Sequence, residues 1–177
     1  MRISLVSGST RSRSTNTAAM RTIQEVVPRG VTTVLYDGLA RLPAFNPDED
    51  RDPLHPAVSE LREQVTAADA VVFSTPEYAG TLPGSFKNLL DWVVGSGALH
   101  GKPAAWVNVA AEGRGTNAHS AMLTVLEYLG PDIIDAACVR APVARDAVGQ
   151  DGTVLDTDFR ERVARSVHEF RNHLAAA

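Results

Sequence analysis

The chain opens with the stretch Arg2-Ile3-Ser4-Leu5-Val6-Ser7-Gly8-Ser9-Thr10-Arg11-Ser12-Arg13-Ser14-Thr15-Asn16. Apolar and β-forming side chains dominate residues 2–7, which predicts a strand. A polar loop follows at 8–14, and Ser14 or Thr15 can cap a helix that runs to about Val27. Strand, polar loop and helix in this order make one β-α unit, so this stretch favours an α/β fold with a parallel sheet.

The β-α pattern repeats along the rest of the chain. We expect strands at 2–7, 31–35, 70–73, 103–109 and 133–139, and helices at 14–27, 57–67, 84–95, 118–129 and from Asp156 onward. The run Ala70-Val71-Val72-Phe73 is apolar throughout, as is typical of a strand buried on both faces of a parallel sheet. Five strands with right-handed crossovers predict a flavodoxin-like three-layer α/β/α sandwich with strand order 2-1-3-4-5, formed by one domain over residues 1–177.

The composition excludes several classes of protein. Hydrophobic residues make up 44% of the 177 residues and charged residues 21%, which excludes a disordered chain. The net charge of −4 argues against a nucleic-acid-binding surface, and no apolar run is long enough to cross a membrane. A single cysteine, Cys138, excludes an intramolecular disulfide, and the five histidines lack metal-ligand spacing. We therefore expect a cytoplasmic protein with no metal site and no nucleic-acid or membrane partner.

Positive charge is concentrated at the start of the chain. Residues 1–30 carry five arginines and one glutamate, although the whole chain is acidic. The loop at 8–16 leaves the first strand at the carboxyl edge of the sheet, where such folds bind ligands. Helix N-terminal amides there, with the side chains of Ser9, Arg11, Ser14 and Asn16, predict a phosphate site. The loop lacks both Gly-x-Gly-x-x-Gly and Gly-Lys-Ser/Thr, and a capped, solvated Ser-rich turn is the alternative.

Two further loops are expected at the same edge of the sheet. The second reads Thr75-Pro76-Glu77-Tyr78-Ala79-Gly80-Thr81-Leu82-Pro83-Gly84, and the third reads Ala110-Ala111-Glu112-Gly113-Arg114-Gly115-Thr116. Prolines and glycines fix an irregular backbone in the second loop, and its amides can face a ligand. Taken alone, Tyr78 is more typical of packing than of ligand contact. The acidic segment 36–56 holds four prolines and is expected to be a surface loop that borders the site.

Together these motifs resemble the NADPH-dependent FMN reductase family. Its pattern Gly-Ser-x-Arg-x-x-Ser-x-Asn is matched by Gly8, Ser9, Arg11, Ser14 and Asn16. Its patterns Thr-Pro-Glu-Tyr-Asn and Pro-Gly-x-x-Lys-Asn-x-x-Asp-Trp are matched by Thr75 to Tyr78, Pro83, Gly84, Lys87, Asn88, Asp91 and Trp92. The resemblance covers nearly the whole chain. Two departures stand out: Ala79 replaces the family's Asn, so one polar contact to the flavin ring is expected to be missing, and the third loop lacks the usual hydroxyl-rich, double-glycine pattern.

The resemblance implies an oxidoreductase that binds FMN and takes a hydride from NADPH or NADH. The acceptor would be a small molecule such as a quinone, free flavin, azo compound or metal oxyanion, and no catalytic side chain is required. The residues implied to bind FMN are Ser9, Arg11, Ser14, Thr15, Asn16, Pro76, Glu77, Tyr78, Ala79, Gly80, Ala111 and Gly113. The flavin phosphate would lie on loop 8–16 and the ring against 76–80.

Two other functions remain open at this point. One is a flavodoxin-type electron carrier without substrate turnover, and the other is a flavin-free binder of phosphate or nucleotide. The resemblance also implies a homodimer or homotetramer. Trp92 lies off the apolar stripe of helix 84–95, so we expect it to anchor the subunit interface. The alternative is that Trp92 packs beneath a loop of its own chain.

Overall fold

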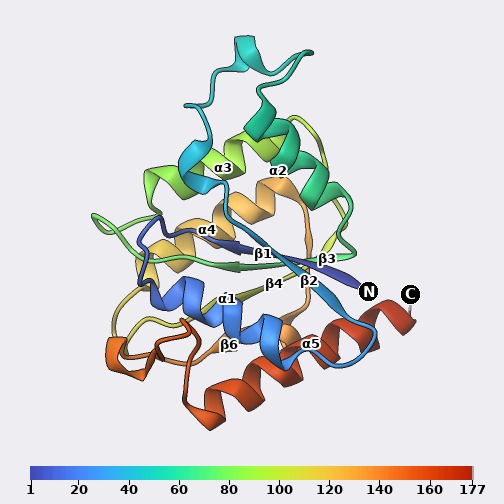
Figure 1. Cartoon of the computed structure of the whole chain (residues 1–177). Coiled ribbons are helices and arrows are strands. Elements are labelled where there is room, and N and C mark those ends of the chain that lie inside the picture. The colour runs from blue at the N-terminus through green and yellow to red at the C-terminus, as the bar shows by residue number, and fades with distance from the viewer. Residues whose placement is uncertain (177) are drawn as a thin grey trace.

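The computed structural model describes residues 1–176, in which strands and helices alternate as predicted (Figure 1). The strands are β1 (Arg2–Ser7), β2 (Thr32–Tyr36), β3 (Ala70–Ser74), β4 (Pro103–Asn108), β5 (Asp132–Ile133) and β6 (Val139–Arg140). The α-helices are α1 (Thr15–Val26), α2 (Pro56–Thr66), α3 (Gly84–Val94), α4 (Thr116–Leu129) and α5 (Thr157–Ala176). All strand pairs are parallel, and the order β2-β1-β3-β4-β5 confirms the predicted topology.

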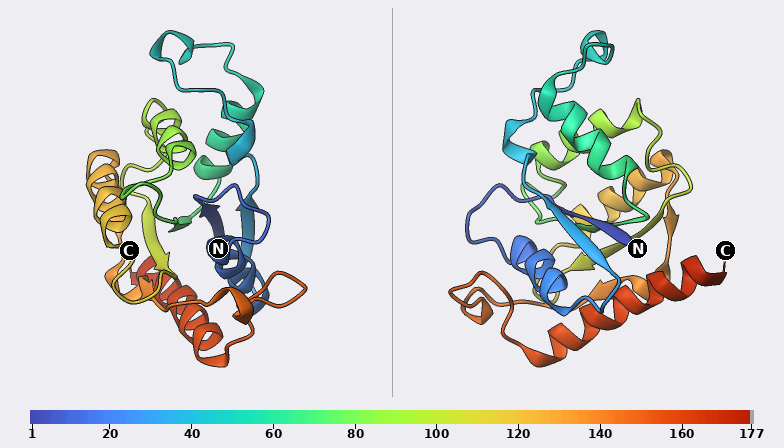
Figure 2. Two further views of the ribbon diagram at one scale, coloured as in Figure 1. Left: turned by 90° about the vertical axis from the view of Figure 1, so that its left-hand side faces the viewer. Right: turned by 45° about the vertical axis from the view of Figure 1, so that its right-hand side comes forward.

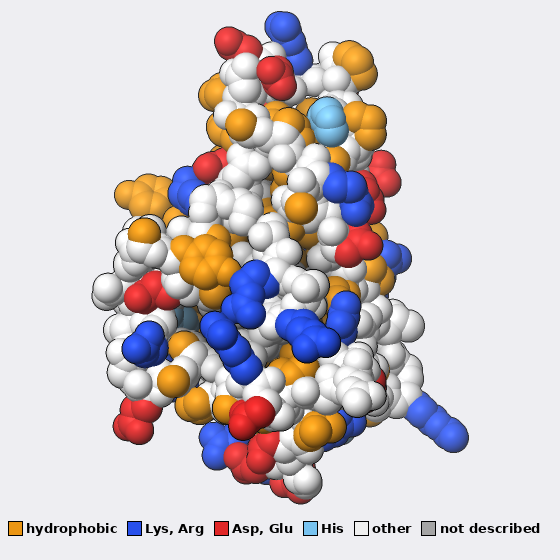
Figure 3. All heavy atoms as spheres, turned by 60° about the vertical axis from the view of Figure 1, so that its left-hand side comes forward, with side chains coloured by type: hydrophobic (Ala, Val, Ile, Leu, Met, Phe, Trp, Pro, Cys, Tyr) orange, Lys and Arg blue, Asp and Glu red, His pale blue; other side chains and the backbone are white. Residues whose placement is uncertain are grey.

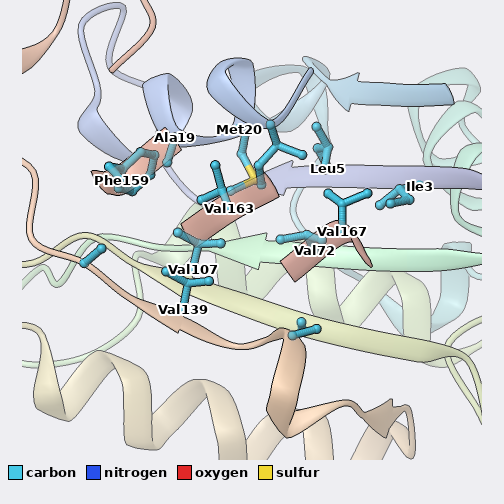
Figure 4. Close-up of a cluster of buried hydrophobic side chains, with 14 of the residues drawn as sticks. Ile3, Leu5, Ala19, Met20, Val72, Val107, Val139, Phe159, Val163 and Val167 are labelled. Carbon is cyan, nitrogen blue, oxygen red and sulfur yellow. The ribbon is translucent and has the colours of Figure 1, made fainter. Parts of the chain in front are cut away.

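Helices cover both faces of the sheet, which makes three layers. Helices α1 and α5 lie on one face and α2, α3 and α4 on the other (Figure 1). Successive strand residues alternate between the two cores: Val72 packs toward α1 and α5 (Figure 4), whereas Val71 and Phe73 pack toward the other helices. Every residue of β3 is buried, which explains why its sequence is apolar instead of alternating.

The strand predicted at 133–139 is wrong as a single element. β5 and β6 are separated by a 3₁₀ turn, Asp135–Ala137, although both pair with β4. Ile133 pairs with Ala104 of β4, and Val139 pairs with Val107 of the same strand. The segment between β5 and β6 is therefore longer than the stretch of β4 that it follows, and the 3₁₀ turn accommodates the extra residues. The buried Ser166 hydroxyl of α5 donates to the Ala137 carbonyl, which replaces the ladder partner that a continuous strand would have supplied.

The prediction that Trp92 anchors a subunit interface is also wrong. Trp92 is 1% exposed, its Nε1 donates to the Pro43 carbonyl at 2.8 Å, and the Phe45 ring meets it edge-on with centroids 4.9 Å apart. Asn88 holds the same loop, because its Oδ1 accepts from the Phe45 amide at 2.7 Å. The alternative of a tryptophan beneath a loop of its own chain is therefore correct.

The acidic segment after β2 is partly packed and partly projecting. Arg62 of α2 donates through Nε to the Trp92 carbonyl at 2.8 Å and pairs with Asp50 at 2.7 Å, with both charged side chains largely buried. Beyond this anchor the segment extends away from α2 and α3 (Figure 2). Among residues 1–176, no helix combines the length and apolar content needed to cross a bilayer.

Candidate functional site

A cleft of about 370 Å³ lies at the carboxyl edge of the sheet, on the face shown in Figure 3. Its walls come from the loops after β1, β3 and β4, as the sequence predicted. The predicted residues that line it are Ser9, Arg11, Ser14, Thr15, Asn16, Pro76, Glu77, Tyr78, Ala111 and Gly113. Ala79 and Gly80 are predicted site residues that do not line it.

The loop after β1 is held in shape by its own hydroxyl groups. Ser14 is the N-cap of α1, and its side chain accepts from the Thr17 amide at 3.4 Å. The Ser7 and Thr17 hydroxyls are 2.8 Å apart, and the Ser9 Oγ accepts from the Arg11 amide at 3.3 Å. These contacts hold the loop against the start of α1, where Ser9, Ser14 and Thr15 line the cleft.

The amides at the start of α1 are free to bind an anion. Within residues 1–176, no acceptor is found for the backbone N–H groups of 12–16. The buried Asn16 side chain accepts from the Ser74 hydroxyl at 2.8 Å, which ties the helix to the end of β3. Free N–H groups and the helix dipole together favour a phosphate at this point.

Gly8 allows the first two loops to approach each other. A Cβ at this position would lie 2.6 Å from the Thr75 Oγ1 and 2.8 Å from the Phe86 Cγ. The Gly8 amide donates to the Ser74 carbonyl at 2.7 Å and extends the pairing of β1 with β3 by one step. Any side chain here would separate the two walls of the cleft.

The second loop ends in a two-residue hairpin. Tyr78 and Thr81 exchange backbone hydrogen bonds of 3.0 and 3.1 Å, and the residues between them, Ala79 and Gly80, have φ of 49° and 74°. Positive φ at both central positions defines a type I′ turn, for which Asn-Gly is strongly preferred. The turn therefore gives a backbone reason for asparagine at position 79, separate from any contact with a ligand.

Glu77 connects the second loop to α4. Its Oε2 accepts from the Asn117 and Ala118 amides at 3.0 and 3.1 Å, and it caps a helix whose N-cap, Gly115, has no side chain. Sequence reasoning assigned Glu77 only to cofactor binding and missed this role. These two hydrogen bonds hold one carboxylate oxygen of Glu77 at the N-terminus of α4, while the residue also lines the cleft.

The cleft contains more cations than the sequence predicted. Arg114 and Arg145 join Arg11 in its lining, and none of the three forms an ion pair within residues 1–176. Arg145 comes from the 3₁₀ turn Arg145–Ala147, far from the other loops in sequence and without any motif that marked it. The other lining residues that were not predicted are Thr75, Val109, Ala110 and Gly115.

The free amides and cations of the cleft suit an anionic ligand, and its lining residues include no paired nucleophile and base. Cys138 lies elsewhere, beside β6, and burial raises the pKa of its thiol to about 11. An inert thiol agrees with the prediction for this residue.

Comparison with known proteins identifies that ligand class. The sequence pattern of the NADPH-dependent FMN reductase family matches residues 1–145. The chain belongs to this family. It is 34% identical to an NAD(P)H-dependent FMN reductase of Pseudomonas aeruginosa over 92% of this chain and 89% of that protein. A quinone reductase of Pseudomonas putida is 31% identical over 80% and 75% of the two chains.

A solved structure agrees with the sequence relatives. The flavoenzyme NAD(P)H:(acceptor) oxidoreductase of Paracoccus denitrificans superimposes with a TM-score of 0.77 and 26% identity, covering 97% of this chain and 98% of that one. Family membership confirms the predicted class, a flavin-dependent NAD(P)H oxidoreductase with FMN as its cofactor. It favours this class over the flavodoxin-type carrier.

Proposed function

We propose that the cleft binds FMN with its phosphate on loop 8–16, and that the enzyme uses NADPH or NADH to reduce a small acceptor. One observation carries this proposal. The loop whose backbone amides at 12–16 have no acceptor lines the same cleft as Arg11 and Arg145. Charge-assisted hydrogen bonds from these donors suit a phosphate dianion. When bound, FMN supplies the hydride and electron transfer.

The other two loops would border the flavin ring. Tyr78 lines the cleft and is 44% exposed, so its ring has a free face at the cleft rim. In the third loop, the amides of 111–113 have no acceptor within residues 1–176, whereas the Arg114 amide closes a turn on the Ala111 carbonyl. Free donors and the Arg114 cation would stabilise negative charge that develops at the pyrimidine edge of the ring.

We propose a quinone as the acceptor, within the wider class of quinones, free flavins, azo compounds and metal oxyanions. The relationship to a quinone reductase supports this choice. Glu112 and Arg114 are exposed on the third loop, and Arg114 lines the cleft. These charges would favour a polar acceptor over a large apolar one.

We also propose a cytoplasmic homodimer or homotetramer in which residues 1–177 act as one domain. Use of NAD(P)H and the presence of only one cysteine support the location. With Trp92 buried, the apolar side chains that remain for an interface include Tyr128 of α4, which is 91% exposed. Light scattering at micromolar concentration tests the assembly, since a mass near that of one 18.9 kDa chain would contradict it.

Steady-state turnover tests the proposed function. The purified protein, reconstituted with FMN, should oxidise NADPH or NADH in proportion to added benzoquinone. A protein that binds FMN but shows no NAD(P)H oxidation would be a carrier instead of an enzyme. A protein that binds no FMN would contradict the proposal outright.

A further inference from the structure

A second cavity of about 570 Å³ adjoins the flavin cleft, and nothing in the proposed function uses it. The two share Arg11, Ser14 and Arg145. The second cavity runs from the phosphate loop along the flank of α1 to the loop at 148–152, and its other lining residues are Ser12, Arg13, Thr17, Ala18, Arg21, Val148, Gly149, Gln150 and Gly152. It therefore begins where the flavin phosphate would end.

Four arginines line this cavity and no acidic residue does. Arg11, Arg13, Arg21 and Arg145 form no ion pair or side-chain hydrogen bond within residues 1–176. Basic side chains gather near the centre of this face in Figure 3. All four residues are exposed to solvent, and a bound anion would supply the counter-charge that no neighbouring side chain gives them.

The nearby acid, Asp151, is hydrogen-bonded within its own loop. The Asp151 Oδ1 accepts from both the amide and the hydroxyl of Thr153, each at 2.9 Å. Arg21 instead lies against Gly152, where a Cβ would come within 2.5 Å of its Nη1, and Gly152 has a φ of 81°. The absence of a side chain at Gly152 leaves room for the Arg21 guanidinium at the cavity wall.

The loop that forms the far wall is held firmly against α1. The buried Thr22 Oγ1 accepts from the Val154 amide at 2.8 Å and donates to the Ala18 carbonyl at 2.8 Å. This contact fixes the segment after Gly152 against α1, about two helical turns beyond the free amides at its start. The cavity is therefore a built part of the fold and not a gap beside a loose loop.

One phosphate does not account for all of this charge. A phosphate monoester carries at most two negative charges, which Arg11, Arg145 and the free amides already match. Arg13 and Arg21 lie outside the flavin cleft and are left for a second anionic group. The volume is in the range that holds a ligand of nucleotide size, and Ala18, Val148 and Gln150 give apolar and amide surfaces suited to a base and ribose. Guanidinium groups also stack well on purine rings.

We propose that this second cavity binds the adenylate half of a flavin dinucleotide, so that the protein accepts FAD as well as FMN. The pyrophosphate would bridge the shared residues Arg11 and Arg145, and its second phosphate would face Arg13 and Arg21. This inference rests on the proposed placement of the flavin phosphate.

Flavin-fluorescence titrations of the apoprotein test this inference. We compare FMN and FAD binding to wild type, Arg13→Ala and Arg21→Ala, with Arg29→Ala as the matched control, because Arg29 is an exposed arginine outside both cavities. Wild type should bind FAD at least as tightly as FMN. Arg21→Ala and Arg13→Ala should each weaken FAD binding by about tenfold or more and leave FMN within about twofold, since each removes a charge-assisted contact. Arg29→Ala should change neither.

Three outcomes would overturn the inference while leaving the flavin site in place. The first is that wild type binds FAD much more weakly than FMN. The second is that Arg21→Ala weakens FMN and FAD binding equally. The third is that Arg13→Ala and Arg21→Ala leave FAD binding unchanged but raise the KM for NADPH and not for NADH. The last would assign the arginines to the phosphate of the hydride donor. If wild type binds neither FMN nor FAD, the proposed function itself fails.

Discussion

The strained turn at Ala79 gives a prediction whose size follows from the backbone. Placing alanine in the left-handed region costs about 1–2 kcal/mol, because its Cβ comes close to the backbone carbonyl. Asparagine adopts this region more readily, because its side chain can hydrogen-bond to the nearby backbone. Ala79 has a φ of 49° and is exposed, so replacing it disturbs no packing. Ala79→Asn should therefore raise the free energy of unfolding by about 1 kcal/mol, which corresponds to a Tm increase of roughly 2–4 °C for a chain of this size.

Glycine at the same position separates strain from chain entropy. Ala79→Gly removes the same strain but gives the unfolded chain more freedom, at a cost of about 0.5–1 kcal/mol, so its gain should be smaller than that of Ala79→Asn. Ala67→Asn is the matched control, because Ala67 is exposed and has a φ of −74°. Its effect on the free energy of unfolding should stay within about 0.5 kcal/mol.

Urea unfolding of the four apoproteins and FMN titrations of the same samples decide the matter. If Ala79→Asn is no more stable than wild type, the argument from the turn is refuted. If Ala79→Asn instead tightens FMN binding with no gain in stability, position 79 contacts the flavin ring, as the sequence motif first suggested.

Three further predictions follow from contacts around the site. Glu77→Ala should lower the free energy of unfolding by about 1–2 kcal/mol in urea titrations, because it leaves the α4 amides uncapped; an unchanged midpoint would contradict the capping role. Burial and the nearby Arg140 lower the pKa of His119 below 6.5, so the free energy of unfolding should fall as the pH drops below 6.5, and His119→Gln should reduce that slope in urea titrations at several pH values. Because the pKa of the Cys138 thiol is about 11, its reaction with a disulfide reagent at pH 8 should be slow in the native protein and fast in urea, and its contribution to stability should be lost between pH 9 and 11.

Most of the fold could be read from local patterns. The apolar run at 70–73, the capping serine at Ser14 and the alternating elements each reflect forces that act within a few residues of one another. The break between β5 and β6 could not be read in this way. Residues 135–137 contain neither glycine nor proline, and the turn forms because α5, far along the chain, packs on Ala137 and supplies Ser166 as a partner.

The same limit applies to the site. Motif residues mark all three loops, but Arg145 enters the cleft from a segment with no motif, and only the tertiary fold brings it there. The predicted interface role of Trp92 is wrong because the position of a residue on its helix does not show which loop will cover it. The carbonyl of Pro43 completes the indole hydrogen bond, and nothing in the composition of an acidic, proline-rich loop indicated that it would fold back onto α3.

The central claim is that loop 8–16 binds the flavin through its phosphate. Its most direct test compares the Kd of FMN with that of riboflavin, which lacks the phosphate, for wild type and Arg11→Ala, with Arg29→Ala as control. Loss of one charge-assisted contact of about 1.5–3 kcal/mol should weaken FMN binding by roughly ten- to a hundredfold. Riboflavin binding should stay unchanged, and Arg29→Ala should behave as wild type. Equal binding of FMN and riboflavin by wild type, or unchanged FMN binding by Arg11→Ala, would contradict the account.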